Sequence, residues 1–255
     1  MDLNFDPPWV LATLLLWARI GALFLASPIF SATRVPAPFV VLFTLALSGT
    51  LALGHELRYT GAGAQGIVAF ALALLAEVFI GLLLGFTIQC AAAAFAIAGQ
   101  LMDVQMGLSM GAIFNPVTRS SSPVIGSTLS LFALVYFFAA DAHLAVLRGI
   151  GFSVSSIPLG ALWQLQSPEQ LIVPVAAMFS LSVAVVAPAL FALLLVELAS
   201  MVAARVLPQM NVFFVAIPAK IAIGLGTLAF SVGFMAPITQ RAYTNIFRYW
   251  NEVLR

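Results

Sequence analysis

The chain has 255 residues, of which 63% are hydrophobic and only 7% are charged. A soluble domain carries roughly 25% charged residues, so this composition excludes a water-soluble globular fold and indicates an integral membrane protein with about six helical spans. The formal net charge of +1 favours neither nucleic-acid binding nor polybasic attachment to a membrane surface, and a single cysteine excludes an internal disulfide framework.

The first two apolar segments, 9–30 and 37–54, predict two helices that are separated by a proline-rich turn. A secretory signal needs a basic flank before its apolar run, whereas this chain begins with Asp2 and Asp6 and carries Arg19 within the run. We therefore expect the first segment to be retained as a membrane span.

The third apolar segment, 67–98, is too long for one straight span. About 32 helical residues reach close to 50 Å, against ~30 Å of hydrocarbon, so this helix must tilt, break or project beyond the bilayer. Gly81 and Gly85 form a GxxxG pair within it, which would let a second helix approach closely. Small residues are common in membrane helices, so the pair can also be incidental.

Residues 99–123 predict the longest loop of the chain, because they combine several breakers with several apolar side chains. A solvated linker would be polar, and a membrane span would not hold so many glycines and prolines. Irregular backbone at membrane depth is tolerated only where protein or a water-filled cavity surrounds it. We therefore expect a loop that enters a pore or an interface, and the alternative is an ordinary loop that lies on a partner surface.

Three further apolar segments follow at 124–140, 171–204 and 212–236, and the second of them is again too long unless it bends at Pro174 or Pro188. The mixed stretch 141–170 suits the membrane interface. The tail, 239–255, is basic and contains Tyr243, Tyr249 and Trp250, an interfacial composition. Six spans place both termini on one side, and the distribution of arginines favours a cytoplasmic C-terminus.

No sequence motif of catalysis is present. The chain lacks GxxxxGK, HExxH and CxxC, and His55 and His143 fall in separate predicted loops. A nucleophile with its base cannot be assembled from these residues. We therefore expect no enzyme activity, no catalytic residues, no metal site and no cofactor.

The charged residues within apolar segments are more informative. A charge at the centre of a lipid-exposed helix costs roughly 3 kcal/mol, so such groups normally face protein, water or one another. They either line a translocation path or pair to hold an assembly in register, and Glu197 and Lys220 lie on successive apolar segments where they could form an ion pair. A multi-span transporter for a small solute, with Glu77, Asp103 and Lys220 in its path, is the alternative. We find no internal repeat of the kind that such transporters often show.

Two stretches carry a resemblance to a known family. Residues 99–110 read GQLMDVQMGLSM, with Asn115-Pro116 shortly after, and residues 205–221 read RVLPQMNVFFVAIPAKI. Together they resemble the FliR family of flagellar export-gate proteins, whose virulence counterpart is the SctT subunit of type III secretion systems. The elements Pro-Gln-x-Asn-x-Phe and Pro-x-Lys-Ile are specific. The chain departs from the family in having Ala216 and Ile217 where a glycine is expected before the late proline, and we expect no fused downstream subunit after the tail.

The resemblance implies an all-helical membrane protein with a FliP-like part followed by a FliQ-like part, all within a single FliR-like domain of residues 1–255. It implies a single copy of the chain beside several FliP-like and FliQ-like subunits in a helical assembly, with FlhB-like and FlhA-like subunits nearby. This assembly, much of it above the membrane plane, would conduct unfolded polypeptides through the inner membrane at the base of the flagellum. A subunit of a virulence-type type III secretion system is the alternative. The expected partners are thus these subunits, the exported polypeptides and membrane lipid, without nucleic acid.

The resemblance also assigns roles to residues. The middle loop of the family projects into the channel and helps to close it, so its apolar side chains would form a seal: Met106, Met110, Ile113 and Phe114. Residues around them would act as hinges: Gly107, Gly111, Pro116, Ser120, Ser121 and Ser122. The remaining polar residues would make contacts between subunits or within the membrane: Arg19, Glu77, Asp103, Gln105, Glu197, Arg205, Gln209, Asn211 and Lys220.

Overall fold

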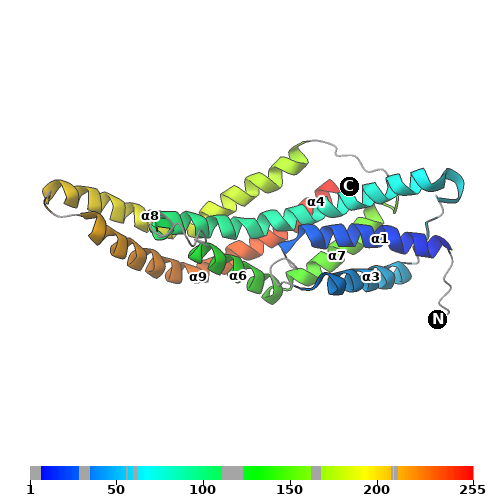
Figure 1. Cartoon of the computed structure of the whole chain (residues 1–255), viewed down its shortest axis with the longest axis horizontal. Helices are drawn as coiled ribbons and strands as arrows, with labels where there is room; N and C mark the ends of the chain where they lie inside the picture. Colours follow the sequence, from blue (N-terminus) through cyan, green and yellow to red (C-terminus); the bar gives the residue numbers. More distant parts are fainter. Residues whose placement is uncertain are drawn as a thin grey trace. The chain divides into compact units, whose positions relative to one another are not determined.

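The computed structural model describes residues 7–28, 35–55, 57–59, 62–110, 123–161, 168–207, 209 and 212–254. Within these residues the chain is all-helical and contains no β-strand, which confirms the predicted fold class (Figure 1). The elements in chain order are α1 (Pro7–Ala26), α3 (Ala37–Gly54), α4 (Ala62–Gln105), the 3₁₀ helix η1 (Leu108–Met110), α6 (Val124–Ala139), α7 (Ala142–Ser156), α8 (Glu169–Val206) and α9 (Val212–Val253).

Prolines mark the starts of several helices. α1 begins at Pro7, α3 has Pro36 as its N-cap, and Pro123 is the N-cap of α6. Proline fixes φ near the helical value, and its missing N–H is no loss in the first turn, where amides have no partner within the helix. At the other end, α7 stops just before Pro158, because a residue that precedes proline is disfavoured in the helical conformation.

Three helices, rather than the two expected, are too long for a single straight span: α4 has 44 residues, α8 has 38 and α9 has 42. α4 continues past residue 98 to Gln105, and α9 continues past residue 236, through Pro237, to Val253. The last part of α9 is amphipathic, because Tyr243, Ile246, Trp250 and Val253 are buried at helical spacing. Tyr243 and Trp250, two of the aromatic residues of the tail, are therefore packed inside the protein.

In the part of the chain that the structure describes, five helices are long and apolar enough to cross a membrane: α1, α3, α4 from Gly66, α8, and α9 from Phe214. α6 and α7 would make a sixth span if the two helices are counted as one. This result agrees with the prediction of about six hydrophobic segments.

The chain divides into two compact units, each built from separate stretches of sequence. Unit 1 comprises Met1–Gln89, Asp141–Val173 and Asn245–Arg255, and unit 2 comprises Cys90–Ala140 and Pro174–Thr244. α4, α8 and α9 each contribute to both units, whereas α1, α3 and α7 belong to unit 1 and α6 belongs to unit 2.

In unit 1, α1 packs against both α3 and α4. Trp17 on α1 donates a hydrogen bond from Nε1 to Thr44 Oγ1 on α3 (3.0 Å), and the rings of Phe24 and Phe43 meet edge to face at 6.1 Å. A Cβ atom on Gly81 or Gly85 of α4 would overlap the backbone carbonyl of Arg19 or Leu23 on α1. Of the two readings that the sequence left open, the GxxxG pair is thus a contact face, and α1 is the helix that packs against it.

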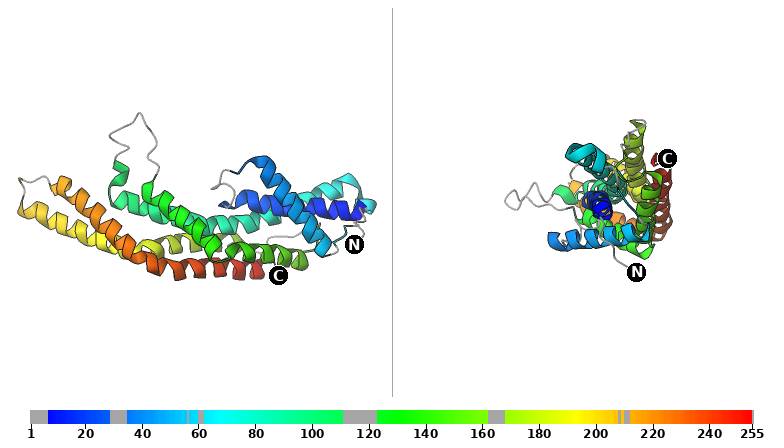
Figure 2. Two further views of the ribbon diagram at one scale, coloured as in Figure 1. Left: turned by 90° about the horizontal axis from the view of Figure 1, so that it is seen from below. Right: turned by 90° about the vertical axis from the view of Figure 1, so that its right-hand side faces the viewer.

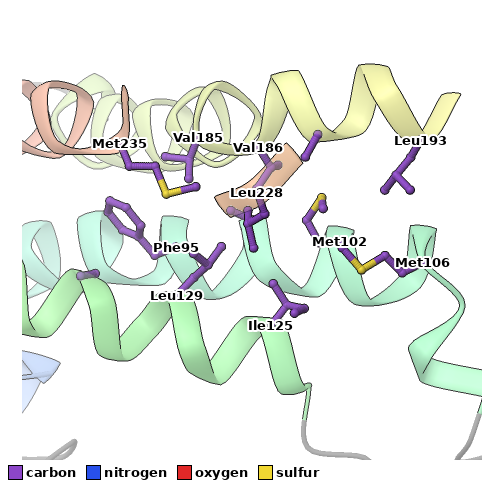
Figure 3. Packing of buried hydrophobic residues seen from close by; sticks show 13 residues of the cluster. Phe95, Met102, Met106, Ile125, Leu129, Val185, Val186, Leu193, Leu228 and Met235 are labelled. Carbon is purple, nitrogen blue, oxygen red and sulfur yellow. The ribbon is translucent and has the colours of Figure 1, made fainter. Parts of the chain in front are cut away.

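Unit 2 has an apolar core to which four helices contribute. In Figures 1 and 2 the unit 2 parts of α8 and α9 run side by side in opposite directions. Figure 3 shows Phe95, Met102 and Met106 of α4 facing the α6 residues Ile125 and Leu129 and residues of α8 and α9. The Tyr243 hydroxyl on α9 donates a hydrogen bond to the Ala133 carbonyl on α6 (3.1 Å).

Candidate functional site

The region of greatest interest in unit 2 lies where α4 ends and α6 begins, on either side of the connection 106–123. Asp103 on α4 is 3% exposed, and its carboxylate points at the first turn of α6. Oδ1 accepts a hydrogen bond from the Ile125 amide at 3.1 Å, and Oδ2 accepts one from the Gly126 amide at 3.0 Å. The carboxylate thereby satisfies two amides that have no partner within their own helix, at the positive end of the α6 dipole.

Two glycines bring the helices close enough for these bonds. A Cβ atom on Gly99 would overlap the backbone of Ile125 and Gly126, so α4 and α6 are in direct backbone contact at this point. There is more space for a side chain at Gly126, since an added Cβ atom would lie 3.0 Å from the Pro123 side chain and 3.4 Å from the Ala96 carbonyl. The contact thus depends on the absence of a side chain at Gly99.

The residues predicted to form the seal fall into two groups. Met106 is fully buried in the core of unit 2 (Figure 3), and its side chain occupies the space that a Cβ atom on Gly224 of α9 would need. Gly107 follows with φ of 78°, a conformation that favours glycine and ends α4. The side chain of Met110 and residues Gly111, Ile113, Phe114, Pro116, Ser120, Ser121 and Ser122 lie outside the described residues.

Arg19 and Glu77 form a buried ion pair in unit 1, which sequence reasoning did not connect. Arg19 Nε donates to Glu77 Oε2 at 2.5 Å, and Nη2 donates to Glu77 Oε1 at 3.1 Å. Both side chains are at most 1% exposed. A bidentate guanidinium–carboxylate pair of this kind holds both groups in one geometry, so it joins α1 rigidly to α4.

Three groups from the α7 region complete this network. Arg19 Nη1 donates to Ser153 Oγ at 2.9 Å, Nη2 donates to the Ile157 carbonyl at 3.1 Å, and the Gly160 amide donates to Glu77 Oε1 at 2.8 Å. These residues were not among the predicted site residues. The sequence pattern could have indicated Ser153, because it is the one polar residue at helical spacing with the apolar residues Ala142, Val146 and Ile150 on the buried face of α7.

The ion pair expected between Glu197 and Lys220 is present and joins α8 to α9 in unit 2. It is more open than the pair in unit 1, since Glu197 is 45% exposed and Lys220 is 17% exposed. Gln105, Arg205 and Gln209 are exposed, and Asn211 lies outside the described residues.

A further contact that the sequence reasoning missed involves Trp250 in unit 1. Its indole N–H donates to Thr87 Oγ1 at 2.7 Å, and its ring covers Gly149 of α7. Among the described residues, no three His, Cys, Asp or Glu side chains lie close enough together to hold a metal ion.

Comparison with known proteins identifies the family. Residues 10–246 match the family described as "Bacterial export proteins, family 1". The chain is 30% identical over 252 residues to the flagellar biosynthetic protein FliR of Bacillus subtilis (strain 168), covering 96% of this chain and 93% of that protein. It is 27% identical to FliR of Escherichia coli (strain K12), covering 92% and 90% of the two chains. It is also 32% identical over 161 residues to the Yop proteins translocation protein T of Yersinia pestis, covering 61% of each chain.

These matches agree with the resemblance carried by residues 99–110 and 205–221, and they extend it over nearly the whole chain. The chain therefore belongs to bacterial export proteins family 1, the family of the FliR and type III secretion export proteins.

Proposed function

We propose that this chain is a channel subunit of a type III protein export apparatus in the bacterial inner membrane. With FliP-like and FliQ-like subunits it forms the pore that unfolded export substrates enter, and FlhA-like and FlhB-like subunits work beside it. The observation that carries this proposal is the family match over residues 10–246, together with relatives that are named as flagellar or translocation proteins.

The apolar surface of unit 2 supports an assembly. Phe230 and Phe234 on α9 are 87% and 71% exposed, and Phe191 on α8 is 63% exposed. Side chains of this size are not left in water, so lipid or neighbouring subunits cover them. Exposed polar residues near the α8–α9 turn, such as Arg205 and Gln209, would contact neighbouring subunits, as would the partly exposed pair of Glu197 and Lys220.

The lengths of the matches favour a flagellar apparatus over a virulence one. The flagellar relatives of Bacillus and Escherichia match more than nine tenths of this chain, whereas the Yersinia translocation protein matches 61% of it. We place the C-terminus in the cytoplasm, because Arg241 and Arg248 are exposed on the last part of α9 and such residues concentrate on the cytoplasmic side.

We assign the plug to residues 106–122, which lie between α4 and α6. Met110, Ile113 and Phe114 provide the apolar seal, because methionine re-packs when a polypeptide passes and a hydrophobic constriction excludes ions by dewetting. Gly107, Gly111, Pro116 and Ser120–Ser122 provide the bends. Met106 anchors the start of the segment, since its side chain is buried against Gly224.

The first test is to co-express the tagged chain with its FliP-like and FliQ-like neighbours and to record a native mass spectrum in mild detergent. We expect a discrete complex with one copy of this chain and several copies of each partner. A monomer or a homo-oligomer without those partners would refute the proposal, and a reconstituted assay of solute transport would then be the next experiment.

The second test addresses the plug. Replacing Met110, Ile113 and Phe114 together by alanine should raise the ion conductance of membranes that contain the assembled complex. Met106 is kept in this variant, because its loss would leave a cavity in unit 2 and confound the result. An unchanged conductance, with the complex intact by native mass spectrometry, would remove the assignment of the plug.

A further inference from the structure

We infer that Asp103 is a positioning residue, whose carboxylate caps α6 and thereby fixes the two ends of the connection 106–123 against each other. This inference rests on the proposed function where it concerns the plug. The capping geometry itself is independent of that proposal, because all of the contacts lie among described residues of unit 2.

The α6 helix has no side-chain cap of its own. Its N-cap residue is Pro123, which makes no side-chain hydrogen bond to the helix. A helix start needs acceptors for its first amides, and these usually come from a Ser, Thr, Asp or Asn at the N-cap. Here the acceptor is Asp103, which lies on another helix, 22 residues before Ile125 in the sequence. The bond that completes α6 therefore also joins it to α4.

The hydrogen bonds between Asp103 and α6 lie directly beside the connection 106–123. Asp103 is in the last turn of α4, and Ile125 and Gly126 are in the first turn of α6. Gly99 allows the backbones to touch, and Met106 is held against Gly224. The points where the chain leaves α4 and enters α6 are thus fixed by a carboxylate, a backbone contact and a buried side chain.

The positioning role of Asp103 differs from a chemical role of its carboxylate. A buried carboxylate in a transport protein can also relay protons or bind a cation. Both oxygens of Asp103 already accept backbone amides, and the side chain is 3% exposed. A positioning role depends on the place of α6, whereas a relay depends on the carboxyl group itself. The two roles can be separated by a variant that moves α6 and leaves Asp103 in place.

That variant is Gly99→Ala, because the added methyl group would overlap Ile125 and Gly126 and push the start of α6 away from Asp103. We would compare it with Asp103→Ala and Asp103→Asn. Gly226→Ala on α9 is the matched control for the glycine change, because an added Cβ at Gly226 would have no neighbour within 4 Å. Asp141→Asn is the control for the aspartate changes, because the Asp141 side chain makes no capping hydrogen bond to α7 and asparagine tolerates the left-handed φ of 54° at this position.

Two quantities would be measured. The first is hydrogen exchange of the amides at residues 124–127 in the full-length chain. It should be roughly tenfold faster in Asp103→Ala and in Gly99→Ala, the effect of losing one helix cap, and unchanged in both controls. The second is ion conductance of membranes with the assembled complex, which should rise in both variants and stay low in both controls.

The outcomes separate the possibilities. Unchanged exchange in Asp103→Ala and Asp103→Asn would overturn the capping role. A second outcome is that hydrogen exchange is faster in Asp103→Ala, Asp103→Asn and Gly99→Ala, but ion conductance or export changes only in the two Asp103 variants. This outcome would show that the carboxyl group acts by its own chemistry, and it would overturn the positioning role. If ion conductance stays low in the variant with Met110, Ile113 and Phe114 replaced by alanine, the proposed plug is refuted. The hydrogen-exchange measurements would still decide whether Asp103 caps α6.

Discussion

The two compact units are stabilised in different ways. Unit 1 is joined at its centre by Arg19 and Glu77, whose hydrogen bonds link α1, α4 and the α7 region, and both side chains are withdrawn from solvent. Unit 2 is built around an apolar cluster that includes Met102, Met106 and Val186, and its own ion pair between Glu197 and Lys220 remains partly exposed. A polar network is directional and fails when one member is lost, whereas an apolar core responds mainly to volume.

The largest effect should come from breaking the network of unit 1. Glu77→Ala leaves the Arg19 guanidinium buried without its counter-charge, so we expect a loss of about 4 kcal/mol in the free energy of unfolding. Titration of the purified full-length chain with a denaturing detergent measures this change.

A double variant, Arg19→Met with Glu77→Leu, is the control for charge as such. Replacing both members of a buried pair by apolar side chains often restores stability, so this variant should recover much of the loss. A loss below about 1 kcal/mol in Glu77→Ala would mean that the buried pair does not support the fold of unit 1.

The core of unit 2 should respond to volume instead. Met106→Ala removes a fully buried side chain that covers Gly224 and should cost about 3 kcal/mol in the same titration. Met106→Leu keeps the volume and should cost less than about 1.5 kcal/mol. Equal losses in the two variants would contradict the view that packing, rather than a specific property of methionine, holds this position.

A smaller effect should follow from the helix contact in unit 1. Gly81→Ala places a methyl group against the Arg19 carbonyl and should cost about 2 kcal/mol by overpacking. Gly21→Ala on α1 is the matched control, because nothing lies within 4 Å of its added Cβ and alanine favours a helix. If the two variants have the same unfolding free energy, the close contact between α1 and α4 is absent in solution.

The sequence allowed the apolar helices to be predicted, because their composition leaves few alternatives, but it was less informative about where they end. α4 and α9 run past residues 98 and 236 since their later turns are held by packing of one face, as at Trp250, rather than by hydropathy. Of the two ion pairs, one could be predicted from the sequence and the other could not. Glu197 and Lys220 lie on successive helices and could be matched from the sequence, whereas Arg19 and Glu77 are 58 residues apart and meet only because Gly81 lets α1 approach.

The capping role of Asp103 was also out of reach of the sequence. An aspartate at the end of one helix carries no mark of the helix that it caps, and the approach of α6 depends on a glycine, Gly99, that resembles any other small residue of a membrane helix. The predicted seal and hinge residues from Gly111 to Ser122 rest on the family resemblance alone, because they lie outside the described residues.

The smallest effect on the chain itself should come from the open ion pair of unit 2. Lys220→Ala should change the unfolding free energy by less than about 1 kcal/mol, because Glu197 is 45% exposed and remains solvated without its partner.

The same variant should lower the yield of the complex with the FliP-like and FliQ-like subunits if Lys220 also contacts a neighbouring subunit, and native mass spectrometry of the co-expressed complex measures that yield. Lys220→Arg keeps the charge and should restore assembly if charge is what the neighbour recognises. A loss of stability in the isolated chain as large as that of Glu77→Ala would instead mean that the two ion pairs play the same part in their units, and the distinction between a closed network in unit 1 and an open pair in unit 2 would have to be abandoned.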